Sequence, residues 1–199
     1  MSNPAFTSVY VVGDKRQLRS LYRKMARLEK RKKPLIDSDF GNCWLGNIVA
    51  RLGANWKEYY CRGKWMSLQL RGNALYFFIE SAGEAPYKFL LLIHKVYPSL
   101  KVYFAAEGDG WDTYVTNDSE GIFFPCRYAL DMPPDVEYYL TLDEVCKQVS
   151  AYIGKEIAPT KEALLAAIDE WEEENTDMEK YIILKEFEVI SEKEMENNF

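Results

Sequence analysis

A short stretch of the chain gathers acidic side chains that could bind a divalent cation. The five carboxylates are Glu107, Asp109, Asp112, Asp118 and Glu120. Hard cations such as Ca²⁺ and Mg²⁺ take several oxygen ligands, which makes a divalent-metal-dependent enzyme one hypothesis. The spacing does not match the calcium loop Asp-x-Asp-x-Asp-Gly, however, and Asp-Gly and Asp-Ser-Glu-Gly segments also suit hairpin turns for backbone reasons. We therefore interpret these carboxylates first as turn residues.

Other catalytic arrangements lack their characteristic residues. His94 is the only histidine, so one chain cannot build a metal site on two imidazoles. It has no Gly-x-Ser-x-Gly elbow nearby, and we interpret it as a histidine on a helix surface. Gly108 and Gly110 lack the third glycine and the following helix of a dinucleotide fingerprint. We expect no cofactor, and we expect a non-catalytic protein rather than an enzyme.

A basic helix and two aromatic strand positions suggest nucleic-acid binding as an alternative. The helix predicted from Asp14 to Lys33 carries Arg19, Arg23 and Arg27 beside its apolar stripe. Tyr10 and Phe78 fall in segments that partly follow the first-strand and third-strand signatures of RNA-recognition motifs.

The two middle aromatic positions of the third-strand signature are occupied by Asn73 and Leu75. We therefore expect most of the base-stacking energy to be missing.

Charge is unevenly distributed along the chain. Residues 1–64 hold 14 Lys and Arg against 5 Asp and Glu, a net charge of +9, whereas residues 65–199 hold 11 against 26, a net charge of −15. Such asymmetry fits either a phosphate-binding face or attraction between the two ends of the chain. We expect the basic helix to neutralise the acidic cluster at 170–177, because the acidic part would repel a polyanion.

The densest group of aromatic side chains suggests a protein-binding patch. It comprises Trp44, Trp56, Tyr59, Tyr60 and Trp65. Aromatic side chains that are partly exposed become anchors of protein interfaces. The alternative is that they cover the basic helix and the edge of a sheet.

The order of apolar segments predicts an α+β fold. Strands are expected at residues 8–12, 64–70, 74–80, 100–105, 111–116 and 122–130, with helices at 14–33 and 86–97 and a short helix at 44–52. This order is a ferredoxin-like βαββαβ sandwich, with an antiparallel sheet extended by further strands. We predict one domain at residues 1–131. Residues 132–199 are predicted to be an acidic, mainly helical C-terminal extension that packs on it, with helices capped by Thr141 and Thr160, a strand at 181–190 and a frayed tail at 191–199.

The central stretch resembles a family of bacterial, plasmid and phage proteins with a YubB-like ferredoxin-like domain. The likeness covers roughly residues 60–130 and consists of several short motifs in order. They are Arg62-Gly63-Lys64-Trp65, Phe78-Ile79-Glu80-Ser81-Ala82 with Pro86, Lys95-Val96-Tyr97-Pro98-Ser99-Leu100, and Ala106-Glu107-Gly108-Asp109-Gly110-Trp111. The resemblance implies a ferredoxin-like fold, a bacterial or mobile-element source, and no particular activity.

Four cysteines and the absence of an export signal in the sequence point to the cytoplasm. Cys43, Cys61, Cys126 and Cys146 form no Cys-x-x-Cys pair, and no run of about 18 apolar residues is present. We therefore predict reduced thiols in a cytoplasmic protein without a membrane partner. The function predicted from the sequence is a non-catalytic protein-interaction module with a protein partner.

Overall fold

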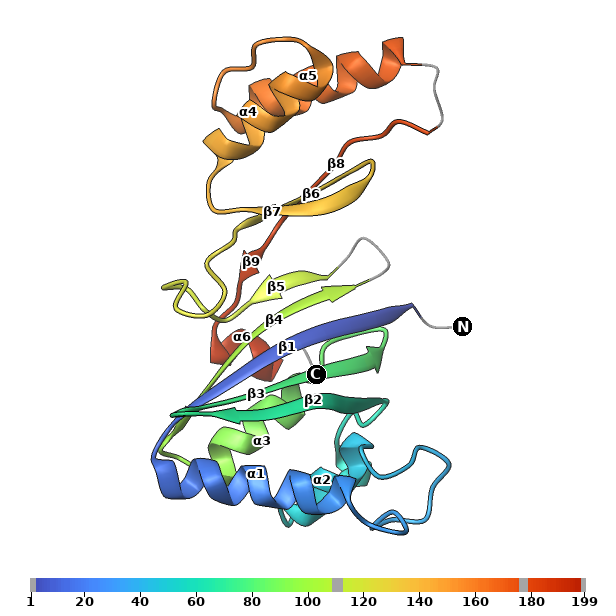
Figure 1. The fold of residues 1–199 in the computed structure, drawn as a ribbon, viewed down its shortest axis with the longest axis vertical. Coiled ribbons are helices and arrows are strands. Elements are labelled where there is room, and N and C mark those ends of the chain that lie inside the picture. Colours follow the sequence, from blue (N-terminus) through green and yellow to red (C-terminus); the bar gives the residue numbers. More distant parts are fainter. Residues whose placement is uncertain (1–2, 109–112, 176–178, 198–199) are drawn as a thin grey trace. The chain divides into compact units, whose positions relative to one another are not determined.

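The computed structural model describes residues 3–108, 113–175 and 179–197, and the chain forms two compact units. Unit 1 comprises Met1–Ser119 together with Val189–Phe199, and unit 2 comprises Glu120–Glu188 (Figure 1). The units therefore divide at residue 119, whereas the sequence predicted a boundary at residue 131. Unit 1 holds 19 Lys and Arg against 14 Asp and Glu, a net charge of +5, and unit 2 holds 6 against 17, a net charge of −11.

Unit 1 is built on a six-stranded sheet in the order β2-β3-β1-β4-β5-β9. Its strands are β1 (Pro4–Gly13), β2 (Gly63–Arg71), β3 (Ala74–Ala82), β4 (Leu100–Gly108), β5 (Tyr114–Thr116) and β9 (Glu188–Val189). β1 pairs antiparallel with both β3 and β4, β2 pairs antiparallel with β3, and β4 pairs antiparallel with β5. β3, β1, β4 and β5 therefore lie inside the sheet, between the edge strands β2 and β9.

The helices of unit 1 cover one face of this sheet. They are α1 (Lys15–Glu29), α2 (Leu45–Arg51), the 3₁₀ turn η1 (Trp56–Glu58), α3 (Tyr87–Val96) and α6 (Glu192–Asn197). α1 begins where predicted, because the Asp14 carboxylate accepts hydrogen bonds from the backbone N–H groups of Arg16 and Gln17. Its predicted apolar stripe is confirmed, since Leu18, Leu21, Met25 and Leu28 are all buried.

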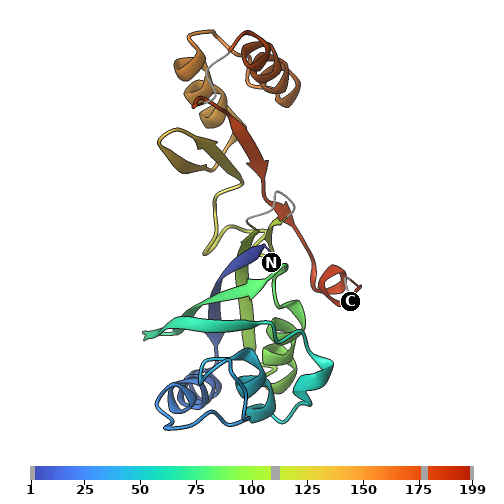
Figure 2. The ribbon, with the colours of Figure 1, turned by 90° about the vertical axis from the view of Figure 1, so that its right-hand side faces the viewer.

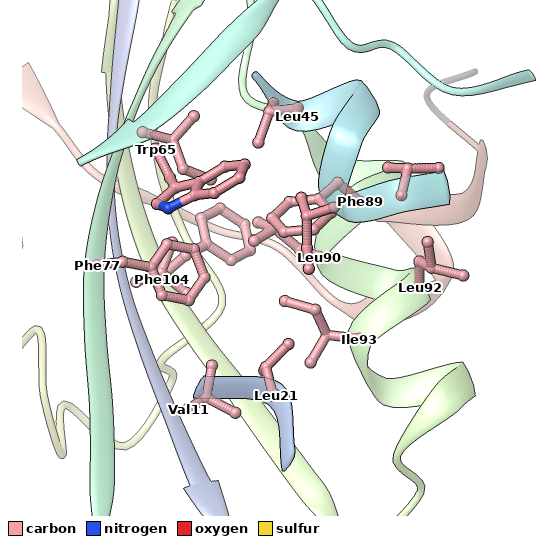
Figure 3. Close-up of a cluster of buried hydrophobic side chains, with 14 of the residues drawn as sticks. Val11, Leu21, Leu45, Trp65, Phe77, Phe89, Leu90, Leu92, Ile93 and Phe104 are labelled. Atoms are coloured by element: carbon pink, nitrogen blue, oxygen red, sulfur yellow. The ribbon is translucent and has the colours of Figure 1, made fainter. Parts of the chain in front are cut away.

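The core of unit 1 lies between these helices and the sheet. Figure 3 shows Phe77 and Phe104 of the strands pointing toward Phe89 and Ile93 of α3, with Trp65 beside them. Each of these five side chains is at most 1% exposed. The end of the chain joins the same core, because α6 packs on α3 and Met195 is buried. Figure 2 shows the chain ending in the short helix α6. The prediction of a frayed tail at 191–199 is therefore wrong for the described residues 191–197.

A β-bulge in β2 breaks the strict alternation of side chains that a regular strand would have. Strict alternation places Trp65 on one face and Leu68 and Leu70 on the other. The register of β2 against β3 shifts between Met66 and Gln69, and Ser67 there has a left-handed φ of 56°. The extra residue brings Leu68 and Leu70 to the same side as Trp65, where all three contact the core.

Unit 2 has a sheet and a core of its own. Its strands are β6 (Tyr128–Met132), β7 (Asp135–Tyr139) and β8 (Ile183–Glu186), in the order β7-β6-β8, and its helices are α4 (Leu142–Ile153) and α5 (Lys161–Glu174). Thr141 and Thr160 cap α4 and α5 as predicted, and Thr141 forms a capping box with Glu144.

One prediction for this part of the chain is wrong. The strand expected at 122–130 starts only at Tyr128 and belongs to the second sheet, because β6 pairs with β7 and β8. Within residues 132–199 the structure has the helices α4, α5 and α6 together with the strands β7, β8 and β9. Among the described residues, no helix combines the length and the apolar character needed to cross a membrane.

Candidate functional site: the aromatic face of unit 1

Strand alternation gives the sheet of unit 1 a second face, which none of its described helices covers. Along β1, Ala5, Val9 and Val11 are fully buried toward the helices, whereas Phe6 is 39% exposed and Tyr10 is partly exposed. We call the second face the aromatic face and define it by Phe6, Tyr10, Met66, Tyr76 and Phe78. None of these five side chains belongs to the core of unit 1.

The strand register arranges the aromatic face in rows across the sheet. Tyr10 lies opposite Tyr76 of β3 on one side and Tyr103 of β4 on the other. The Tyr10 and Tyr76 ring centroids are 5.0 Å apart, and the Phe6 and Phe78 rings stack at 6.0 Å with 21° between their planes. Contacts between rings of this kind hold the side chains in defined positions before any partner binds.

The row that contains Phe6 carries charge. Phe6 lies opposite Glu80 on β3 and Glu107 on β4, so a carboxylate flanks it on each neighbouring strand. Lys64 of β2 lies opposite Glu80 and pairs with it at 3.1 Å, with both side chains largely exposed. The aromatic face therefore combines apolar rings with both signs of charge.

A cavity of about 380 Å³ adjoins this charged row, at the end of the sheet where β1 and β2 begin and β3 ends. Its lining residues are Pro4, Phe40, Arg62, Gly63, Lys64, Glu80, Ser81 and Ala82. The Phe40 ring, 63% exposed, stacks on Trp44. Gly63 is required here, because a Cβ atom at this position would lie 2.7 Å from the Glu80 carbonyl oxygen. The close approach of β2 to β3 thus forms the floor of the cavity.

Two of the five residues in the aromatic patch predicted from the sequence are core residues. Trp44 and Trp65 are 4% and 1% exposed. Their indole N–H groups donate to the Cys61 carbonyl oxygen and to the Glu29 carboxylate. Trp56 packs edge-on against Trp44.

The two tyrosines of that predicted patch are held in place as well. Tyr59 is partly buried against the core, and the Tyr60 hydroxyl donates to the Ala82 carbonyl oxygen. Of the five aromatic residues, Trp65 contacts the basic helix through Glu29.

The two parts of the predicted nucleic-acid site lie on opposite sides of the sheet. Arg19, Arg23 and Arg27 are exposed on α1, which packs on the helix-covered face, whereas Tyr10 and Phe78 lie on the aromatic face. A ligand on one of these surfaces does not reach the other.

The acidic cluster at 170–177 has a basic partner within unit 2. Glu170 forms an ion pair with Lys155 of unit 2. No ion pair between described residues involves α1.

The predicted acidic site divides between the units. Asp109 and Asp112 lie outside the described residues. Glu107 is on β4, Asp118 is buried after β5, and Glu120 is exposed and belongs to unit 2. Within the described part of the chain, no group of three or more His, Cys, Asp or Glu residues could hold a metal ion.

The histidine and the cysteines have structural surroundings. His94 Nδ1 lies 2.8 Å from the Leu100 carbonyl oxygen, which ties the end of α3 to the start of β4. The four cysteines are free thiols, and burial raises the pKa of Cys61 to about 11. A thiol with a raised pKa holds little thiolate at neutral pH and is a poor nucleophile.

Sequence reasoning missed Phe6 and Tyr76 as surface residues. A strand of alternating apolar residues does not show which face a helix will cover. The structure also shows where Asn73 and Leu75 lie. Asn73 is in the turn between β2 and β3, and Leu75 is buried in the core, so the aromatic-face positions of β3 are Tyr76 and Phe78.

Comparison with protein-family models, with curated proteins and with solved structures finds no match for this chain.

Proposed function

We propose that the protein is a non-catalytic module that binds another protein through the aromatic face of unit 1. The observation that carries the proposal is the stacked set of Phe6, Phe78, Tyr10 and Tyr76 on the sheet face that no described helix of unit 1 covers. Aromatic residues, Met and Arg are enriched at protein interfaces, and Met66 and Arg62 lie at this face and its adjoining cavity.

The charge on the face favours a protein over a nucleic acid. Affinity for nucleic acid comes largely from cations that contact phosphates. Here Glu80 and Glu107 flank Phe6, and Lys64 is already paired with Glu80. A protein surface with apolar side chains and a few cations matches this arrangement better than a polyanion does.

A site-specific cross-link tests the proposal. A photoreactive p-benzoylphenylalanine replaces Phe6 in one sample and the exposed α1 residue Arg23 in a matched control. We expect one defined protein to be captured from the source cells at position 6 and not at position 23. Equal capture at both positions would contradict an interface on the aromatic face.

Single-stranded nucleic acid is the second candidate. Tyr10 on β1 and Tyr76 and Phe78 on β3 lie on two adjacent inner strands of the sheet, where bases could stack on their rings. In this case labelled single strands bind the wild type, and Tyr76→Ala weakens binding while Arg19→Gln on α1 does not. Fluorescence anisotropy at low salt separates this outcome from protein binding.

We also propose that unit 1 has the ferredoxin-like topology. Its support is the element order β1-α1-β2-β3-α3-β4 and the neighbour order β2-β3-β1-β4, with antiparallel pairs. α2 and η1 are then insertions, and β5 and β9 are additions at one edge. Nuclear Overhauser contacts from β1 to both β3 and β4 test this order. The relation to the YubB-like family and the cytoplasmic location stay predictions.

A further inference from the structure

The strand β7 forms an exposed edge of the second sheet. It is one of the two outer strands in the order β7-β6-β8. Residues 135–138 are exposed, with Val136 at 41% and Tyr138 at 47%. An exposed edge strand is a template onto which another extended chain can add, since its outer backbone groups can hydrogen-bond to a new strand.

Backbone alternation shows which residues of β7 direct their N–H and C=O groups toward the outer edge. The Arg127 N–H donates to the Tyr139 carbonyl oxygen at 2.9 Å, so the backbone groups of Tyr139, Glu137 and Asp135 point toward β6. Consecutive residues of a strand direct their backbone groups to opposite edges, so those of Val136 point outward. The next outward N–H after β7, that of Leu140, donates to the Glu144 carboxylate at 2.9 Å. Glu144 of the α4 capping box thus occupies the first outward N–H beyond β7. The segment that remains available to pair with a new strand is therefore short.

The two sides of β7 differ in chemistry. Asp135 and Glu137 lie opposite Met132 and Leu130 of β6, on the side that α4 and α5 cover. Val136 and Tyr138 are on the other side. A strand added to β7 would therefore meet carboxylates along one of its faces and apolar side chains along the other.

A second copy of the chain does not match this edge. The symmetric antiparallel register that uses all five residues of β7 places Glu137 opposite Glu137, and like charges directly opposite each other destabilise a strand pair. Unit 2 also carries a net charge of −11, which repels a second copy of itself. The same charges attract a basic segment.

We propose that the β7 edge binds an extended segment of a partner protein, in which Lys or Arg alternates with apolar residues, by strand addition. An apolar residue of the segment pairs with Val136 and exchanges backbone hydrogen bonds with it. A basic residue of the segment lies opposite Glu137. This surface belongs to unit 2 and is independent of the function proposed for unit 1.

A labelled peptide of alternating Lys and Val residues tests the proposal by fluorescence anisotropy with the full chain. In one modified peptide the backbone nitrogens of the valines are methylated, and in a second those of the lysines are methylated. Each change removes backbone N–H donors without changing the charge of the peptide. Only the valine N–H groups face β7 in the proposed register. We therefore expect valine methylation to weaken binding about tenfold, through the lost hydrogen bonds, and lysine methylation to leave binding unchanged.

Two protein variants complete the test. Val136→Pro removes an outward N–H at an edge position that tolerates proline, and we expect it to weaken binding about as much as valine methylation does. Glu137→Lys should reverse the preference toward a peptide of alternating Glu and Val, which keeps the test valid if Val136→Pro unfolds by circular dichroism. Absence of binding at millimolar peptide, or equal affinity for both methylated peptides, would overturn the proposal.

Discussion

Ser67 shows how one backbone position decides which side chains reach the core. Its φ of 56° lies in the left-handed region, which costs a residue with a Cβ atom about 1–2 kcal/mol. We expect Ser67→Gly to raise the free energy of unfolding by up to about 1 kcal/mol, because glycine avoids this cost, and Ser67→Val to lower it by more than about 1 kcal/mol. Urea unfolding of the two variants measures both. A stabilising valine would show that the bulge is not needed.

Cys61 gives the protein a pH dependence with a defined sign. Burial raises its pKa from 9.0 to about 11, so the thiol ionises in the unfolded chain at a lower pH than in the folded one. The stability that Cys61 contributes is therefore fully present below pH 9 and is lost as pH rises toward 11.

Urea unfolding at rising alkaline pH, for the wild type and Cys61→Ala, measures this contribution. We expect stability to fall more steeply in the wild type than in the variant. Identical slopes would mean that the thiol ionises equally in both states. The other titrating groups are common to both proteins and cancel in the comparison.

At the scale of elements, adjacent residues of β3 separate stability from binding. Phe77 is fully buried against Phe89 of α3, whereas Phe78 is only partly buried and stacks on Phe6 of the aromatic face. We expect Phe77→Ala to cost about 3–5 kcal/mol and Phe78→Ala well under half of that. Thermal and urea unfolding give the comparison. Equal losses would show that the aromatic face is a second core rather than a surface.

The Asn117 side chain hydrogen-bonds to the backbone of β4, a role that the sequence did not reveal. Its side chain accepts a hydrogen bond from the Phe104 N–H at 2.8 Å and donates to the Val102 carbonyl oxygen at 2.7 Å. The side-chain amide therefore takes the place of a paired strand beside β4, beyond the short β5. We expect Asn117→Ala to lower the free energy of unfolding by about 1–3 kcal/mol, because two backbone groups lose their partners. Asn55→Ala, at the start of the exposed turn η1, is the control and should cost about 1 kcal/mol or less.

The elements also show what the sequence can and cannot predict. The helix α1, the strands of unit 1 and the caps at Thr141 and Thr160 follow from local signals, namely apolar spacing and capping residues. The second sheet does not, because residues 122–130 read as one more hairpin strand and only long-range pairing of β6 with β8 assigns them elsewhere. The sequence likewise did not show which aromatic residues lie on the exposed face of the sheet. Tyr10 and Phe78 were recognised, but Trp44 and Trp65 looked as suitable for contact and are core.

For the whole molecule, the two units present different surfaces. Unit 1 carries the aromatic face and a net charge of +5, and unit 2 carries an acidic sheet edge and a net charge of −11. Proteins that act by binding often place separate contacts on separate units, since linked sites add avidity when both are engaged. Separate surfaces on the two units support the proposed role in protein binding, and the central claim of that proposal concerns the aromatic face.

The binding isotherm of the cross-linked partner, once purified, tests that claim most directly. Isothermal titration compares the wild type with Phe6→Ser/Phe78→Ser and with the matched surface variant Arg19→Gln/Arg23→Gln/Arg27→Gln. We predict that the aromatic-face variant loses at least about 2 kcal/mol of binding free energy, as expected for anchor residues, and that the α1 variant binds like the wild type. Unchanged affinity in the folded aromatic-face variant, or loss in the α1 variant alone, would contradict the account.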